Sequence, residues 1–185
     1  MDKNLVLIQF SSRKSGNCSA IAAFIRDYYA KDNVMTYYLD AENMSPCKQC
    51  NYECLKPGEI CPNRSVFQLE LMDAICCSDL TYFIVPDYCG FPCANYFAFN
   101  ERSVGYFNGS KELLMKYLDV RKRFIVVSNT EGESFKQALQ QQTNDVPDIL
   151  YLKTRKYDKI SIAGDLLESA AAGADLKAFL EKDLL

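Results

Sequence analysis

Four cysteines form the densest group of reactive side chains in the sequence. They follow the spacing C-x2-C-x3-C-x6-C and are Cys47, Cys50, Cys54 and Cys61. Four thiolates from one loop can hold a tetrahedral zinc ion or an iron–sulfur cluster. In a reducing compartment such thiols can also stay free or pair reversibly. The spacing therefore predicts a metal or redox loop, with zinc, a cluster and unligated thiols as its three alternatives.

A second group of polar residues, at positions 11–19, is suited to holding an anion. It reads Ser-Ser-Arg-Lys-Ser-Gly-Asn-Cys-Ser and lies between an apolar run and a helical pattern. A phosphate needs several donors on one side, which serine hydroxyls, the Arg13 and Lys14 cations and helix N-terminal N–H groups would supply. Gly16 permits a tight turn, and Asn17 is a favourable N-cap. The segment predicts a phosphate site, with plain capping of the helix as the alternative.

The residue spacing of this segment limits which phosphate it would bind. It does not end in the Gly-Lys-Ser/Thr of a Walker A loop, and it lacks the G-x-G-x-x-G of dinucleotide sites. A single monophosphate is therefore a better match than a nucleoside triphosphate or a tightly held NAD.

The absence of histidine restricts the chemistry that side chains alone could perform. It excludes a Ser-His-Asp triad, a Cys-His dyad, a histidine general base and any histidine-ligated metal. Chemistry must then come from cysteine, tyrosine, carboxylates or a cofactor.

The elements that must position these groups alternate along the chain. Apolar runs typical of buried strands lie at 4–10, 34–39, 80–85, 123–127 and 149–154, with 159–163 as an extension at the sheet edge. Helical periods predict helices at 17–31, 66–77, 96–102, 111–118, 135–142 and 165–184, the last interrupted near Gly173. Pro86 is expected to end the third strand. This alternation predicts an α/β fold with a five-stranded parallel sheet covered on both faces.

The phosphate-type segment matches the pattern of a known family at Ser11, Arg13, Lys14, Gly16 and Asn17. It resembles the phosphate loop of the NADPH-dependent FMN reductase and iron–sulfur flavoprotein group of the flavodoxin-like superfamily. Over roughly 4–135 the order of loops is also similar: phosphate loop after the first strand, aromatic loop after the third, polar loop after the fourth. The resemblance implies a single domain, 1–185, with a three-layer flavodoxin-like fold, strand order 2-1-3-4-5 and a cysteine-rich insertion at about 41–65.

The resemblance also implies which residues contact the cofactor, FMN. The 86–92 segment resembles the family's Pro-x-Tyr-x-Gly loop that lines the flavin ring, and 128–134 stands where the third flavin loop is placed. Read without the family, these loops are a Pro/Gly turn beside core aromatics and a polar cap of the next helix. The implied phosphate contacts are Ser11, Arg13, Ser15, Gly16, Asn17 and Cys18. The implied ring contacts are Pro86, Asp87, Tyr88, Cys89, Gly90, Phe91, Asn129, Thr130 and Gly132.

The implied activity is that of an FMN-dependent oxidoreductase. A reduced nicotinamide, NADH or NADPH, would give a hydride to flavin N5, and the electrons would pass to free flavin, a quinone or another small acceptor. Two alternatives stay open: a non-catalytic electron-transfer flavoprotein with a cysteine-ligated 4Fe–4S cluster, and a zinc-stabilised binding module without flavin. The family also implies a ferredoxin-like redox partner, and a homodimer or homotetramer in which a neighbouring chain completes the pocket.

Composition limits the remaining function classes. Apolar residues make up 49% and charged residues 24% of the chain, and the net charge of −3 has the wrong sign for a nucleic-acid binder. No run approaches the ~18 apolar residues of a membrane span. The first apolar run is too short for a secretory signal. The sequence therefore predicts a cytoplasmic protein that binds neither nucleic acid nor membrane.

Overall fold

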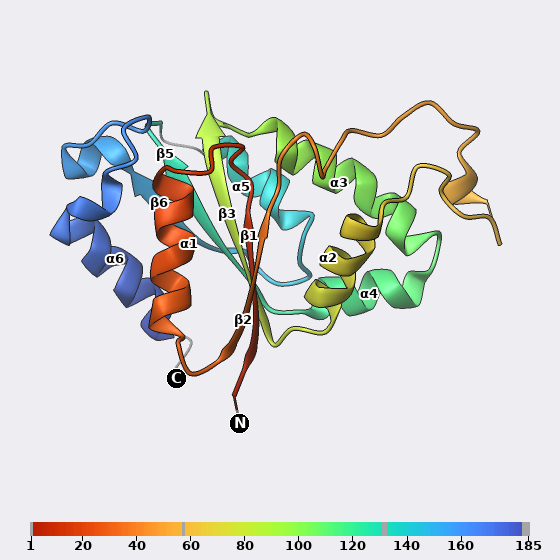
Figure 1. Ribbon diagram of the computed structural model, residues 1–185, viewed down its shortest axis with the longest axis horizontal. Coiled ribbons are helices and arrows are strands. Elements are labelled where there is room, and N and C mark those ends of the chain that lie inside the picture. Colours follow the sequence, from red (N-terminus) through yellow and green to blue (C-terminus); the bar gives the residue numbers. More distant parts are fainter. Residues whose placement is uncertain (1, 57, 131–132, 183–185) are drawn as a thin grey trace.

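The computed structural model describes residues 2–56, 58–130 and 133–182. Five parallel strands run through its centre in the order β2-β1-β3-β5-β6 (Figure 1). They are β1 (Asn4–Gln9), β2 (Asn33–Tyr38), β3 (Leu80–Tyr88), β5 (Lys122–Ser128) and β6 (Asp148–Lys153). A two-residue strand, β4 (Phe91–Pro92), pairs antiparallel with the end of β3. Counting the parallel strands alone, the order is 2-1-3-4-5, so the predicted flavodoxin-like topology is confirmed.

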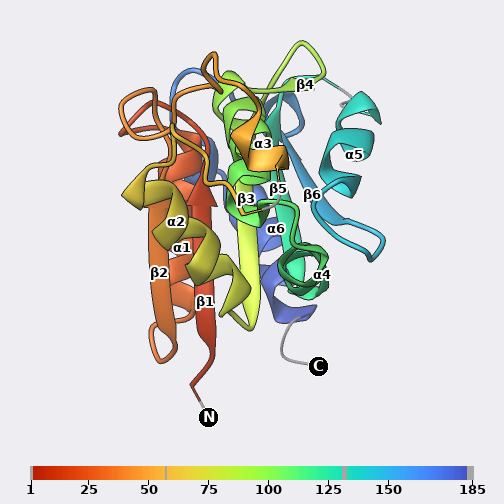
Figure 2. The ribbon, with the colours of Figure 1, turned by 90° about the vertical axis from the view of Figure 1, so that its right-hand side faces the viewer.

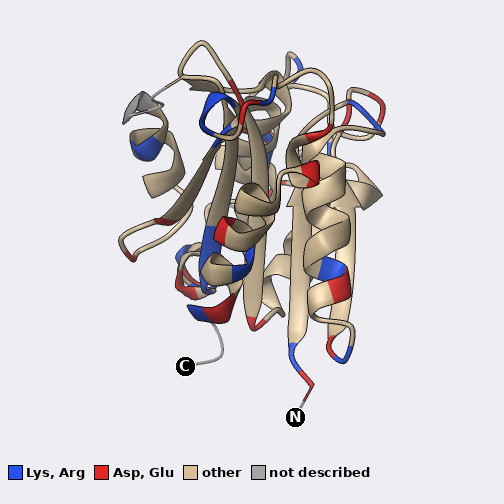
Figure 3. Ribbon diagram, turned by 90° about the vertical axis from the view of Figure 1, so that its left-hand side faces the viewer, with Lys and Arg blue, Asp and Glu red and all other residues tan. Residues whose placement is uncertain are grey.

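Helices cover both faces of the sheet, as parallel strands joined by crossovers require (Figures 1 and 2). One layer consists of α1 (Asn17–Tyr28) and α6 (Ala170–Glu181). The other consists of α2 (Val66–Cys76), α3 (Ala94–Phe107), α4 (Lys111–Asp119) and α5 (Glu133–Gln140). Acidic and basic residues are interspersed over the side with α1 and α6 (Figure 3). Within the described ranges, no helix has both the length and the apolar character needed to cross a bilayer.

The central strands β1, β3 and β5 are largely apolar because both of their faces are buried. In β1, Leu5 and Leu7 belong to the core between the sheet and the α1–α6 layer. Val6 and Ile8, which point the other way, belong to the core on the opposite face. All four side chains are fully buried, and each contributes about 2 kcal/mol of burial free energy. The continuous apolar runs that predict the strands therefore also supply the two cores.

β3 continues past Pro86, so the prediction that this proline ends the strand is wrong. The carbonyl oxygen of Ile84 accepts from Phe10 N at 3.0 Å, which shows that the backbone groups of alternate residues face β1 here. Pro86 faces the same side, and the Phe10 carbonyl that its missing N–H would have met accepts instead from Asn95 Nδ2 at 2.9 Å and from the Cys93 thiol at 3.3 Å. The strand then turns back through Cys89 and Gly90, both at positive φ (55° and 84°), as a two-residue hairpin requires.

The 159–166 segment turns across the start of α1 and does not extend the sheet. The predicted edge extension at 159–163 is therefore wrong: Ala163 N donates to Ile160 O at 3.2 Å, which closes a turn. The short 3-10 turn η3 (Leu166–Glu168) follows and α6 begins after Ser169. The predicted interruption near Gly173 is also wrong, because Gly173 N makes a regular helical bond to Ser169 O at 3.1 Å.

Lys122, at the start of β5, is a buried cation whose pKa makes stability depend on pH. Its Nζ donates to the carbonyl oxygens of Tyr117 and Val120 and lies 4.2 Å from the centroid of the Tyr117 ring. Burial lowers its pKa from 10.5 to about 7, although the charge of Cys76 opposes the shift. Between these values the unfolded chain binds the proton and the folded chain does not, so stability rises with pH.

We expect the free energy of unfolding to increase by about 2 kcal/mol between about pH 7 and pH 9 from this residue alone. Urea unfolding at the two pH values measures it, and the Lys122→Met variant serves as reference because it lacks the titrating group. Cys18 sets the upper end of the pH range over which stability rises. Its pKa is raised to about 12, so above the ordinary thiol value of 9.0 the unfolded chain loses this proton first and stability falls. An equal pH dependence in both proteins would contradict the prediction.

Candidate functional site

A cavity of about 230 Å³ lies at the carboxyl edge of the sheet, where open parallel sheets bind their ligands. Its lining residues come from four segments and are Ser11, Arg13, Gly16, Asn17, Cys18, Pro86, Asp87, Tyr88, Cys89, Val127, Asn129, Ser161 and Ile162. The first three segments are the three predicted loops, which the fold brings together. The fourth segment, Ser161 and Ile162, lies in the range 159–163 that was expected to extend the sheet edge.

The helix α1 begins at this cavity without a side-chain cap. Its N-cap is Gly16, and among the described residues no side chain accepts a hydrogen bond from its first turn. Those N–H groups have no carbonyl partner within the helix, and the positive end of the helix dipole lies beside them. The start of α1 is therefore arranged for an anion. The predicted N-cap, Asn17, is instead the first helical residue.

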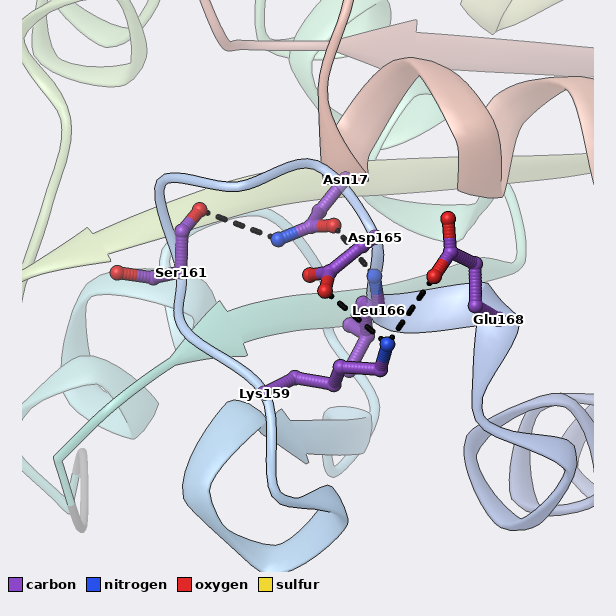
Figure 4. Close-up of polar contacts among 6 residues, drawn as sticks. All are labelled: Asn17, Lys159, Ser161, Asp165, Leu166 and Glu168. Carbon is purple, nitrogen blue, oxygen red and sulfur yellow. Dashed lines mark hydrogen bonds and ion pairs between the residues drawn. The ribbon is translucent and has the colours of Figure 1, made fainter.

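The Asn17 side chain is used to hold the 159–166 segment (Figure 4). Its Nδ2 donates to Ser161 O at 3.1 Å, and its Oδ1 accepts from Leu166 N at 3.0 Å. Asn17 is 5% exposed and Leu166 is fully buried. If Asn17 contributes to a phosphate site, it does so through its backbone N–H, because its amide is already paired at both ends.

Two glycines allow the 159–166 segment to lie directly on the 11–16 loop. Gly164 has a φ of +80°, and a Cβ there would lie 3.2 Å from Gly16 Cα. Any side chain at Gly164 would strain the backbone and push the two segments apart. On the same segment, Lys159 Nζ lies 3.0 Å from Asp165 Oδ2 and 3.2 Å from Glu168 Oε2, which ties it to the turn before α6 (Figure 4).

Arg13 and Cys18 set the electrostatics at the start of α1. Arg13 is exposed, and its Nη1 donates to Ile162 O at 3.2 Å, which keeps the guanidinium beside the cavity. Cys18 is buried, and burial, reinforced by Cys93, raises its pKa to about 12 even though Arg13 acts in the opposite direction. The thiol is therefore neutral at physiological pH and adds no negative charge to the site.

Asp87 links the second and third loops. It is 7% exposed, and its Oδ1 accepts from Gly90 N at 2.7 Å inside the hairpin. Its Oδ2 accepts from Thr130 Oγ1 at 2.6 Å and from the Ser128 hydroxyl. Ser128 Oγ in turn accepts from Thr130 N at 2.8 Å. One carboxylate thus fixes the hairpin after β3 to the loop after β5.

Several predicted contact residues lie away from the cavity lining. Ser15 is exposed on the 11–16 loop, Gly90 and Phe91 lie at the hairpin tip, and Thr130 is bonded to Asp87. Gly132 lies outside the described residues. Val127, Ser161 and Ile162 also line the cavity, although they are not among the predicted contact residues. Val127 is the apolar end of a predicted strand, and no motif marks the other two, which reach the site only through tertiary packing.

The four cysteines of the 41–65 segment do not form a metal site in the described part of the chain. Cys47 is exposed, and its N–H donates to Glu101 Oε2 at 3.1 Å, whereas Cys61 is buried against Gly105 of α3. Burial, followed by the charges of the other three thiols, raises the pKa of Cys54. No group of three or more cysteine, aspartate or glutamate side chains there is placed to hold a metal ion. The predicted zinc or 4Fe–4S site is therefore not supported.

Comparison with known proteins identifies the fold and not a sequence family. No family model matches the sequence, and no curated protein matches it either. Among solved structures, Smu.1420 from Streptococcus mutans UA159 is similar with a TM-score of 0.66 and 15% identity, over 96% of this chain and 98% of that one. The Trp repressor binding protein from Bacillus subtilis is similar with a TM-score of 0.63 and 12% identity, over 95% and 97% of the two chains.

A third similar structure is FerB from Paracoccus denitrificans, a flavoenzyme NAD(P)H:(acceptor) oxidoreductase. Its TM-score is 0.55 and its identity 14%, over 97% of this chain and 96% of that one. At these identities the likeness is one of architecture, over nearly the whole length of each chain. The chain therefore has the flavodoxin-like fold that these structures share.

Proposed function

We propose that this chain binds FMN non-covalently and passes electrons from NAD(P)H to a flavin, a quinone or another small acceptor. The observation that carries the proposal is the start of α1, which lacks a side-chain cap among the described residues and opens into the same cavity as Tyr88. A protein of the same fold, FerB, is a flavoenzyme that oxidises NAD(P)H. The structural similarity to FerB supports the class of reaction, and the lining of the cavity supports FMN as the cofactor.

The phosphate of FMN fits the donors around the start of α1. Gly16, Asn17 and Cys18 line the cavity there, and a Cβ built on Gly16 would meet nothing within 4 Å, so space for a ligand exists beside the backbone. The Arg13 guanidinium supplies a cation, and the neutral Cys18 thiol introduces no repulsion. A phosphate monoester, with a charge of about −2, is stabilised by this combination of donors.

The flat ring of FMN fits the surface between the ends of β3 and β5. Val127 and Pro86 give that part of the lining an apolar character, and Tyr88, 54% exposed, provides an aromatic ring at its rim. Asn129 adds an amide that can both donate and accept hydrogen bonds. A mostly apolar pocket with a few polar groups is typical of cofactor sites.

FMN, when bound, supplies the hydride-accepting chemistry that the lining side chains lack. The protein's part is to bind and orient. Asp87 keeps the hairpin of Tyr88 and Cys89 in register with the loop after β5. The 159–166 segment closes the cavity on the side of α1 through Ser161 and Ile162.

FMN titration of protein purified without flavin tests the proposal. We expect quenching of flavin fluorescence at one FMN per chain and an absorbance band at about 450 nm. Arg13→Ala should weaken FMN binding about tenfold, because one charge-assisted hydrogen bond is lost. Arg26→Ala, at the far end of α1, is the matched control and should leave FMN affinity unchanged. Protein that stays colourless and does not quench added FMN would refute the proposal.

Anaerobic mixing of the FMN-loaded protein with NADH or NADPH tests the reaction itself. Rapid bleaching of the flavin band supports the reductase. A band that persists while FMN remains bound supports the alternative of a non-catalytic electron carrier, which needs another protein to deliver electrons.

A further inference from the structure

A second hollow, of about 300 Å³, lies between the 11–16 loop and the end of β2. It shares Ser11 and Arg13 with the first cavity, and a smaller hollow near Pro86 and Tyr88 shares the same two residues. Its other lining residues are Gln9, Ser12, Lys14, Tyr38, Leu39 and Asp40. Because none of these six residues lines the first cavity, the second hollow has room for a different ligand.

Gln9 gives this hollow a buried acceptor that has no partner. The side chain is 1% exposed, and its Nε2 donates to the carbonyl oxygens of Ser11 at 2.7 Å and Arg13 at 3.5 Å. Those two carbonyls fix which end of the amide carries the hydrogens. The Oε1 atom is buried and has no hydrogen bond to any described residue. A ligand with an O–H or N–H group would satisfy it.

Asp40 gives the hollow a carboxylate that is held in one position. Its Oδ1 accepts from Glu42 N at 2.9 Å and from Asn43 N at 3.1 Å, and its own N–H donates to Asn43 Oδ1 at 3.0 Å. Asn43 Nδ2 also donates to Tyr38 O at 2.7 Å. Oδ1 is occupied by the turn, whereas Oδ2 accepts no hydrogen bond from the described residues and can accept from a ligand in the hollow.

The remaining walls supply a cation and an aromatic ring. Lys14, on the 11–16 loop, brings positive charge, and Tyr38, which is 44% exposed, offers a ring for stacking. A ligand with an anionic group would pair with Lys14, and its hydroxyl donors would bond to Gln9 and Asp40. A flat base on the same ligand would stack on Tyr38.

We infer that this hollow binds the adenosine half of the pyridine dinucleotide, with the phosphates near Lys14, the ribose at Asp40 and Gln9, and the adenine on Tyr38. The inference rests on the proposed function and adds a preference between the two nicotinamide dinucleotides. A carboxylate at the ribose accepts from a free 2′-hydroxyl and repels a 2′-phosphate. The chain should therefore prefer NADH to NADPH.

Calorimetric titration of FMN-loaded protein with ADP-ribose tests the inference without requiring turnover. We expect one ADP-ribose per chain, and binding about tenfold weaker in Asp40→Asn, which keeps the Oδ1 acceptor of the turn but loses the charge. Glu42→Gln, two residues away and outside the hollow, should bind as the wild type does. The 2′-phosphorylated ADP-ribose should bind more weakly than ADP-ribose to the wild type, and this difference should vanish in Asp40→Asn.

Three results would overturn the inference: no ADP-ribose binding, equal affinity in Asp40→Asn and Glu42→Gln, or displacement by inorganic pyrophosphate as effective as by ADP-ribose. A Tyr38→Leu variant, expected to lose about fivefold in affinity, checks the stacking wall independently. FMN titration of the same samples separates the two claims. Normal FMN binding with no ADP-ribose binding refutes this subsite alone, whereas a wild type that binds no FMN refutes the proposed function.

Discussion

Asp87→Ala is expected to weaken FMN binding about 100-fold and to lower the free energy of unfolding by about 3 kcal/mol. The carboxylate accepts from Gly90 N, Ser128 Oγ and Thr130 Oγ1, and it is 7% exposed. Its removal leaves three donors without their acceptor and releases the hairpin from the loop after β5. Fluorescence titration with FMN and urea unfolding at neutral pH measure the two effects.

Two further variants show whether Asp87 acts by positioning the loops. Asp87→Asn keeps one acceptor oxygen, so we expect a loss of affinity of about tenfold or less. Thr130→Val removes a single bond to Oδ2 and should show part of the alanine effect. In the double variant of Asp87→Ala and Thr130→Val the two losses should not add, because both break the same link. Full additivity, or unaltered FMN affinity in Asp87→Ala, would contradict the positioning role.

Asn17→Ala is expected to lower the free energy of unfolding by about 2–3 kcal/mol and FMN affinity about tenfold. The substitution leaves the N–H of Leu166, a fully buried residue, and the carbonyl of Ser161 without their partner. The 159–166 segment then loses its attachment to α1, and with it the wall formed by Ser161 and Ile162. Hydrogen exchange of this segment should become faster, which a change elsewhere in the fold would not produce.

Asn17→Asp separates the attachment from the anion site. The carboxylate still accepts from Leu166 N, and a negative charge in the first turn of α1 is favourable to the helix. Stability should therefore fall less than in Asn17→Ala. FMN affinity should fall more, because the carboxylate repels the phosphate at the same helix end. The opposite ranking of the two variants would show that the start of α1 does not hold an anion.

The layers of the fold and the edge at which the site lies follow from local sequence patterns. A strand buried on both faces is apolar at nearly every position, and the runs at 5–8 and 82–85 have that character. Parallel strands present their carboxyl ends at one edge, so the loops after β1, β3 and β5 had to meet there. These inferences need only local composition and the rule that crossovers are right-handed.

Local patterns did not determine how the elements end. Pro86 lacks an N–H, which normally stops a strand, yet here the side chain of Asn95 donates to the Phe10 carbonyl in its place. The cysteine spacing predicted a metal loop, but Cys61 is buried against Gly105 while Cys47 is exposed. In each case the outcome depends on a neighbour that lies far away in the sequence.

The hydrogen-bond pairs around the site follow from the packing of the folded chain and not from local sequence. Asn17 and Ser161 are 144 positions apart, and nothing in either local sequence indicates the bond between them. Asp87 bonds to Thr130, and Gln9 and Asp40 line the same hollow, only because the sheet order places their strands side by side. Hydrophobic periodicity records whether a residue is buried. Hydrogen-bond partners depend instead on how the layers pack, because the packing sets which loops lie close enough to bond.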